Sequence, residues 1–117
     1  FHVGAALLTK EGKVYQGCNI ENAAYSPSVC AERTAFFKAV YEGERNFKAI
    51  AIMGGPETVK GPDCDICAPC GICRQVMMEF CDPGTFEILL GTPEKYEIYT
   101  LKEILPLGFG SANLEKK

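Results

Sequence analysis

Apolar positions recur with two different periods along this chain, and the periods predict which segments are strands and which are helices. Short apolar runs bounded by Gly, Pro, Asn or Asp are typical of strands, and they occur at residues 3–8, 14–17, 47–53, 85–90 and 96–100. Apolar residues at helical spacing occur at 30–41 and 70–80. The predicted order ββαβαββ indicates an α/β fold, in which helices pack on a mixed sheet of five strands.

Length and composition favour one compact domain over residues 1–117. Hydrophobic residues make up 47% of the chain, which is sufficient for a genuine core. Seven cysteines cannot all pair within the chain, and four of them follow one another at three-residue spacing. This pattern favours metal binding in a reducing compartment over a secreted disulfide framework, so we expect a cytoplasmic protein.

Charge and hydropathy argue against two classes of partner. The net charge is −3, and the Lys and Arg residues are scattered along the chain. No basic surface is therefore expected to follow the phosphates of a nucleic acid. No apolar run approaches the roughly 18 residues needed to cross a bilayer, so we also expect no membrane partner.

Three cysteines are arranged as ligands of a catalytic metal ion. Cys30 begins one predicted helix, and Cys70 and Cys73 lie in the first turn of the other. The positive end of a helix dipole stabilises a thiolate, which is the form that binds metal. A structural zinc site uses four protein ligands, whereas a catalytic site uses three and leaves one position to water or substrate. Three thiolates therefore predict one catalytic Zn²⁺ per chain.

Two charged side chains follow the first of these cysteines. Glu32 is placed to act as a base that takes a proton from water and returns it to a leaving group. A Glu in the first helical turn is more often only a partner of the helix dipole. Three thiolates and one Zn²⁺ sum to −1, and Arg33 is placed to offset this charge, the alternative being an ordinary surface ion pair. Because three candidate metal ligands lie nearby, we favour proton transfer as the role of Glu32 and charge compensation as the role of Arg33.

Cys-x-Glu followed at a distance by Pro-Cys-x-x-Cys is the signature of zinc deaminases, and further motifs extend the match. In chain order they are residues 4–8 (GAALL), 17–25 (GCNIENAAY), 30–35 (CAERTA) and 69–77 (PCGICRQVM). From residue 1 to about residue 109, the chain resembles the homotetrameric type of cytidine deaminase. The resemblance implies a three-layer α/β/α fold, with helices on both faces of the five-stranded sheet.

The resemblance also implies the reaction and the reacting groups. Cytidine and deoxycytidine would be hydrolysed to uridine and deoxyuridine with release of ammonia, in pyrimidine salvage. Cys30, Cys70 and Cys73 would bind zinc, and Glu32 would transfer protons while hydroxide attacks C4 of the cytosine ring.

The segment Asn19, Ile20 and Glu21 would bind the nucleoside, with Asn19 and Glu21 hydrogen-bonded to the ribose hydroxyl groups. An amide and a carboxylate two residues apart in an extended segment point the same way, which suits a diol. Without the surrounding motif, turn chemistry and a solvated charge would be the better explanation of these two residues.

Three more residues have roles implied by the resemblance. Phe1 would lie against the pyrimidine, and Ala31 would offer its backbone to the base. Phe109 would reach the pocket of a neighbouring subunit, which places the sites of a homotetramer near subunit interfaces. The alternatives are a core position for Phe1 and a packed aromatic in the tail for Phe109.

The sequence departs from the family pattern at two places, and alternatives remain open. The connection before Pro69 is longer than usual and adds Cys64 and Cys67, so that Cys64, Cys67, Cys70 and Cys73 could hold a structural zinc ion or an iron–sulfur cluster in a non-catalytic module. A deaminase of a modified cytosine nucleoside such as blasticidin S is a further alternative. The family usually has a helix before the segment that begins at Phe1, and we expect this domain to lack it.

Overall fold

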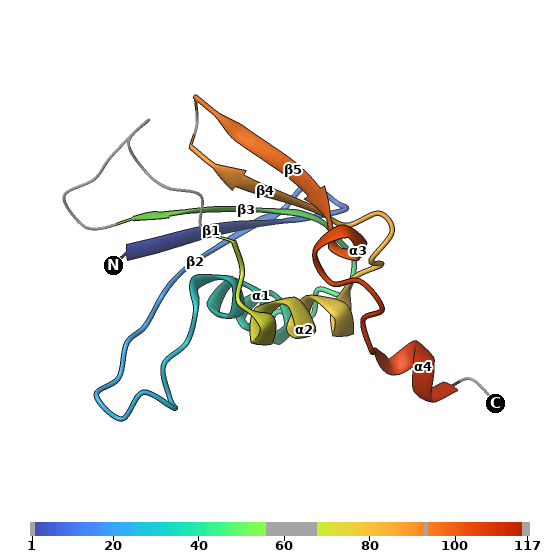
Figure 1. Ribbon diagram of the computed structural model, residues 1–117, viewed down its shortest axis with the longest axis horizontal. Helices are drawn as coiled ribbons and strands as arrows, with labels where there is room; N and C mark the ends of the chain where they lie inside the picture. Colours follow the sequence, from blue (N-terminus) through green and yellow to red (C-terminus); the bar gives the residue numbers. More distant parts are fainter. Residues whose placement is uncertain (1, 56–67, 93, 116–117) are drawn as a thin grey trace.

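The chain forms a five-stranded sheet with helices packed against it in the computed structural model, which describes residues 2–55, 68–92 and 94–115 (Figure 1). The strands are β1 (His2–Thr9), β2 (Val14–Cys18), β3 (Phe47–Gly55), β4 (Glu87–Gly91) and β5 (Tyr96–Thr100). The helices are α1 (Ala31–Tyr41), α2 (Gly71–Phe80), α3 (Leu101–Ile104) and α4 (Ser111–Glu115). The α/β class predicted from the sequence is confirmed.

The sheet has the strand order β2-β1-β3-β4-β5 and is mixed, as predicted. Only β3 and β4 are parallel neighbours, and the other three neighbouring pairs are antiparallel. A tight connection joins β1 to β2, where Gly12 has a φ of 96° and the backbone N–H of Thr9 donates to the Lys13 carbonyl at 2.9 Å. The parallel pair requires a longer crossover connection, which contains α2.

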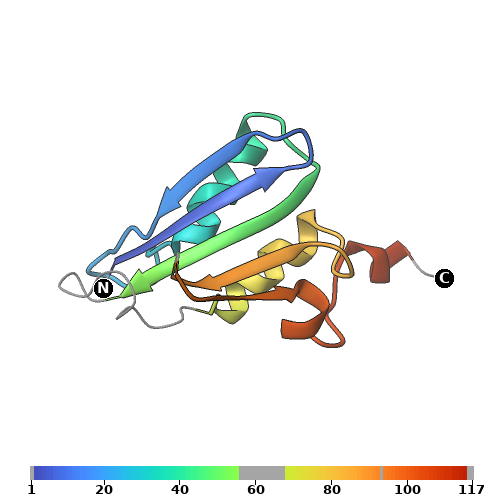
Figure 2. The same cartoon turned by 90° about the horizontal axis from the view of Figure 1, so that it is seen from above.

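One face of the sheet forms the core with α1 and α2. Leu7, Ile50 and Ile88 lie opposite one another on β1, β3 and β4, and all three are fully buried. Phe36 of α1 and Met77 of α2 belong to the same buried cluster. Figure 2, which views the sheet from above, shows both helices beneath it. Burial of alternate strand residues therefore fixes the helices on this face.

The other face of the sheet is apolar but is not covered by a helix within the described ranges (Figure 1). Ala6, Ala51, Leu89 and Ile98 lie side by side across it, and Ile98 is 51% exposed. The expected three-layer arrangement, with helices on both faces, is therefore not seen in this part of the chain. The reason is topological: β2 is parallel to β3 and β3 to β4, and two right-handed crossovers in the same direction place α1 and α2 on one face.

The described helices are all short. None of them combines the length and the apolar character that crossing a membrane requires.

Candidate functional site

The first turns of α1 and α2 lie near each other at one edge of the sheet. Cys30 is the N-cap residue of α1, Cys70 is the N-cap residue of α2, and Cys73 lies in the first turn of α2. Within the described part of the chain, neither N-cap side chain makes a capping hydrogen bond, so the thiols are available for other contacts. Each helix follows a strand, and in open α/β sheets ligands bind beyond the carboxyl ends of the strands.

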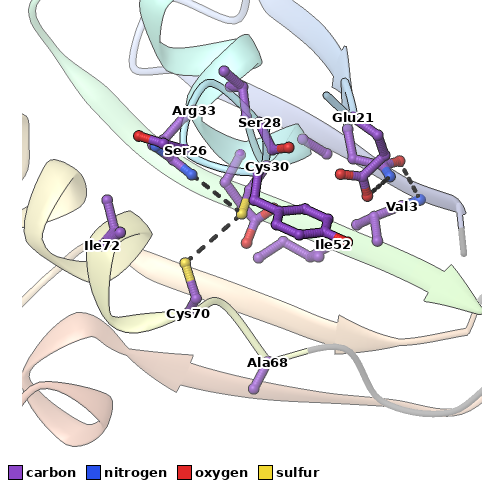
Figure 3. Close-up of a pocket in the computed structure, with 15 residues that line it drawn as sticks. Val3, Glu21, Ser26, Ser28, Cys30, Arg33, Ile52, Ala68, Cys70 and Ile72 are labelled. Carbon is purple, nitrogen blue, oxygen red and sulfur yellow. Dashed lines mark hydrogen bonds between the residues drawn. The ribbon is translucent and has the colours of Figure 1, made fainter. Parts of the chain in front are cut away.

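The three thiols form a cluster that fits a metal ion. The Cys30 and Cys70 sulfur atoms lie 3.7 Å apart and face each other in Figure 3, and the sulfur atoms of Cys70 and Cys73 lie 3.5 Å apart. All three ligand atoms lie within 4.8 Å of one another. Tetrahedral zinc with Zn–S bonds of about 2.3 Å places sulfur atoms roughly 3.8 Å apart. The donor set therefore fits zinc, with three protein ligands and one open position.

Negative charge is crowded in this cluster. Burial raises the pKa of the Cys73 thiol well above its usual range, and the neighbouring Glu32 carboxylate raises it further. Burial also acts to raise the pKa of Cys70, but the nearby backbone N–H group of Cys73 and the thiol of Cys73 outweigh it and lower that pKa below its ordinary value. A divalent cation would offset this crowding and stabilise the three thiolates together.

Glu32 is a buried carboxyl group beside the sulfur cluster. It lies in the first turn of α1, is only 4% exposed and lines the cavity described below. Burial raises its pKa above the ordinary value for Glu, although hydrogen bonds to its own backbone N–H group and to the Cys73 thiol act in the opposite direction. A raised pKa makes a carboxyl group a stronger base than an ordinary Glu side chain, which favours its use in proton transfer.

Arg33 directs its guanidinium group at the sulfur cluster. Its Nη2 atom donates to the Cys30 sulfur at 3.5 Å, as the dashed line in Figure 3 shows. Its Nε atom is buried and has no hydrogen-bond partner among the described residues. A partly buried contact with a thiol favours the charge-compensating role of Arg33 over an ordinary surface ion pair.

A cavity of about 830 Å³ opens beside the cluster. Its walls come from β1, the connection between β2 and α1, the first turn of α1, β3 and the start of α2 (Figure 3). Cys30, Ala31, Glu32 and Cys70 line the end at which the thiols meet. This volume is within the range of small-molecule sites.

Asn19 and Glu21 line the same cavity and contact each other. The Asn19 Nδ2 atom donates to Glu21 Oε1 at 3.2 Å, and Asn19 Oδ1 accepts from the Val3 backbone N–H at 2.9 Å. Ile20 lies between them with a side chain that is 55% exposed and is not part of the cavity wall. Its backbone pairs with that of Val29 at 2.8 and 2.9 Å, so the segment is locally extended and its successive side chains point in opposite directions.

The remaining predicted residues are distributed differently. Phe1, Cys64 and Cys67 lie outside the described residues. Phe109 is 57% exposed and is not part of the cavity wall of its own chain, and its carbonyl group accepts a hydrogen bond from Gln75 Nε2 at 2.6 Å.

Sequence reasoning assigned no role to several residues of the cavity wall. Tyr25, Ser26 and Ser28 precede Cys30, and Ile72 lies between two cysteines and is 62% exposed. The signal that could have found them is their position within or beside the motifs that carry the site residues. Tyr25 also has a φ of 66°, which is uncommon for a residue with a side chain.

Comparison with known proteins identifies the family of this chain. The family model of the cytidine and deoxycytidylate deaminase zinc-binding region matches residues 1–87. Cytidine deaminase of Sporosarcina psychrophila is 48% identical over 114 residues, which are 97% of this chain and 79% of that protein. Blasticidin-S deaminase of Bacillus cereus is 31% identical over 109 residues, which are 92% of this chain and 76% of that protein.

Solved structures agree as well. The crystal structure of cytidine deaminase from Burkholderia pseudomallei has a TM-score of 0.79 and 46% identity, and the match covers 93% of this chain and 82% of that one. The resemblance seen in the sequence is confirmed, and so is the presence of a zinc-binding region. The chain belongs to the cytidine and deoxycytidylate deaminase family.

Proposed function

We propose that this protein catalyses the zinc-dependent hydrolytic deamination of cytidine and deoxycytidine to uridine and deoxyuridine, with release of ammonia. The observation that carries the proposal is the meeting of three thiols and one buried carboxyl group at the end of a cavity of small-molecule size. Support also comes from cytidine deaminases that are 45% and 48% identical to this chain.

Cys30, Cys70 and Cys73 hold one Zn²⁺ per chain as thiolates. Zn²⁺ held by these thiolates would supply the Lewis acidity that lowers the pKa of a water molecule. Arg33 reduces the excess negative charge of the three thiolates through its contact with Cys30. This compensation matters because an overly negative ligand set weakens the Lewis acidity of the ion.

Glu32 moves the protons of the reaction. Its carboxylate accepts a proton from water while the water oxygen forms a bond to C4 of the cytosine ring. The C4–N bond then breaks and the amino group leaves as ammonia. Of the two protons that water brings, one ends on N3 of the product and the other on the ammonia, and Glu32 carries both.

Asn19 and Glu21 bind the ribose hydroxyl groups, and the backbone at Ala31 orients the base. The contact of Asn19 with the Val3 N–H group fixes the amide, so that its NH₂ group faces Glu21 and the cavity. Ile20 supports this segment through its backbone pairing with Val29 rather than through its side chain. A substrate of this kind is a free nucleoside, not a nucleic acid.

We also propose how the domain is assembled and where it acts. Residues 1–117 form one domain, and four copies associate so that Phe109 of one subunit completes the pocket of another. The exposure of the Phe109 and Tyr25 side chains, at 57% and 84%, supports an interface that covers them. Phe1 contacts the pyrimidine, and the enzyme serves pyrimidine salvage in the cytoplasm.

A substrate panel tests the proposal. Free cytidine, deoxycytidine, cytidine monophosphate, blasticidin S and a short cytosine-containing oligonucleotide are incubated with the zinc-loaded protein, and ammonia release is measured. We expect turnover of the two nucleosides, and an increase of about tenfold or more in the KM for cytidine on Glu21→Gln. Turnover of the oligonucleotide alone would refute the proposal. Turnover of blasticidin S alone would establish the second candidate, which the 31% identity to the Bacillus cereus enzyme motivates.

A further inference from the structure

Arg74 joins two distant parts of the chain through their carbonyl groups. Its Nε atom donates to the Pro69 carbonyl oxygen at 2.8 Å, and its Nη1 atom donates to the Ile104 carbonyl oxygen at 2.6 Å. Pro69 precedes a cysteine of the cluster, whereas Ile104 ends α3. Neither carbonyl group accepts a helical hydrogen bond from the described residues, so the guanidinium group supplies the donors that they need.

The contacts of Arg74 hold both peptide groups that flank Cys70. Its side chain binds the carbonyl of Pro69, and its backbone N–H donates to the carbonyl of Cys70 at 3.0 Å. The direction of the Cys70 Cα–Cβ bond is set by the orientation of these two peptide groups. Pro69 is also fully buried, so its carbonyl has little access to solvent as an alternative partner.

The second anchor keeps the guanidinium group in place. Nη1 is held by Ile104, and α3 is itself stabilised by a capping box in which Thr100 and Glu103 bind each other's backbone N–H groups. A planar guanidinium group can reach two carbonyl groups at once with fixed geometry, whereas a lysine ammonium group on a flexible stem cannot reproduce both contacts in this arrangement.

The adjacent residue provides an internal comparison. Gln75 also anchors the C-terminal segment, through the Phe109 carbonyl at 2.6 Å. It is exposed and makes its contact away from Cys70. Arg74 and Gln75 therefore share a helix and a target segment, but only Arg74 holds the backbone of the cysteine.

We propose that Arg74 is a positioning residue for the metal site, whose side chain holds Cys70 in ligand geometry by fixing the peptide group before it, while the ordinary helix hydrogen bond of the Arg74 backbone fixes the peptide group after it. It acts through the backbone and does not touch the sulfur atoms, unlike Arg33. The inference rests on the proposed role of Cys70 as a zinc ligand.

Zinc retention tests the inference directly. Wild type, Arg74→Met, Arg74→Lys and Gln75→Ala are purified with zinc, and the rate of zinc release to an excess of a chromogenic chelator is followed by absorbance. Loss of an outer contact to a metal ligand typically costs about 10- to 100-fold in affinity. We expect Arg74→Met to release zinc at least about tenfold faster and Arg74→Lys to lie between it and wild type. The rate of zinc release from Gln75→Ala should stay within about twofold of the wild-type rate, because the contact of Gln75 does not involve Cys70.

Steady-state kinetics with cytidine provide a second readout. Arg74→Met should lower kcat while it changes KM by less than about threefold, because the substrate-binding groups are not disturbed. A zinc-release rate of Arg74→Met within twofold of wild type would overturn the inference. If that variant does not fold, Arg74→Lys decides, and release at the wild-type rate would overturn the inference equally. A further variant, Cys70→Ser, tests the zinc assignment itself. If Cys70 is not a zinc ligand, this variant will keep one zinc per chain, which distinguishes that failure from failure of the role of Arg74.

Discussion

Gly17 allows β2 to approach the first turn of α1 so closely that no side chain fits between them. A Cβ atom at this position would lie 2.5 Å from the Ala31 carbonyl oxygen and 2.6 Å from the Ala35 backbone nitrogen. Ordinary contact begins at 3.4 Å, so Gly17→Ala requires a displacement of about 0.9 Å. Both obstructing atoms belong to the backbone, and therefore either the N-terminal part of α1, which carries Glu32, or the edge strand β2 must move.

The displacement should affect both stability and catalysis. Insertion of a methyl group into a packed contact costs about 1–3 kcal/mol in the free energy of unfolding. A misplacement of about 1 Å in a catalytic group can lower the rate about 100-fold. We therefore expect Gly17→Ala to reduce kcat for cytidine by about 10- to 100-fold, measured at saturating zinc, and to lower the urea midpoint of unfolding.

Gly4→Ala is the matched control. Gly4 lies on β1 opposite Cys18, and a Cβ atom there would meet nothing within 4 Å. We expect unchanged kcat and equal or slightly higher stability, by up to about 1 kcal/mol, because Ala is less flexible than Gly in the unfolded chain. Wild-type kcat and stability in Gly17→Ala would refute the reasoning. Equal losses of kcat and stability in Gly17→Ala and Gly4→Ala would assign the effect to the replacement of glycine in the β1–β2 pair rather than to the contact with α1.

Three further predictions concern other parts of the molecule. In zinc-free protein, Glu32→Gln should raise the free energy of unfolding at neutral pH but not in acid. Burial raises the pKa of Glu32, so the stability contributed by its protonated form is lost as the pH rises through that pKa. Urea titrations in which the free energies of unfolding of variant and wild type differ by the same amount at every pH would contradict this. Replacing Cys64 and Cys67 together by Ser should leave one zinc per chain and kcat unchanged, whereas loss of zinc on elemental analysis would support the four-cysteine binding module. Tyr15→Phe removes a 3.0 Å hydrogen bond to the buried Glu44 and should lower the urea-derived stability by about 1 kcal/mol, and an unchanged value would show that the bond contributes nothing.

Local sequence signals predicted most of the secondary structure. The helices expected at 30–41 and 70–80 are present as Ala31–Tyr41 and Gly71–Phe80, and the five strands are in the predicted order. These elements follow from periodicity and from the Gly, Pro and Asp residues that end them, which are properties of short segments. The side of the sheet that the helices cover depends instead on strand order, and the resemblance suggested helices on both faces.

The site could be predicted as far as its motifs extend. Cys30, Cys70 and Cys73 were identified as a set by residue type and spacing, and the structure brings their sulfur atoms together. The partners of Arg74 could not be predicted, because its guanidinium group reaches a carbonyl 30 residues away that only the tertiary fold places beside α2. Such contacts carry no local sequence signal.

Glu32→Gln provides the most direct test of the catalytic site. The variant keeps the three thiols and the shape of the side chain but removes the group that accepts and returns protons. We expect one zinc per chain by elemental analysis, as in wild type. We also expect the kcat for cytidine to fall about 100- to 10,000-fold, which is the usual contribution of a general acid–base group. Near-wild-type turnover with full zinc would contradict the assignment of Glu32 as the proton carrier.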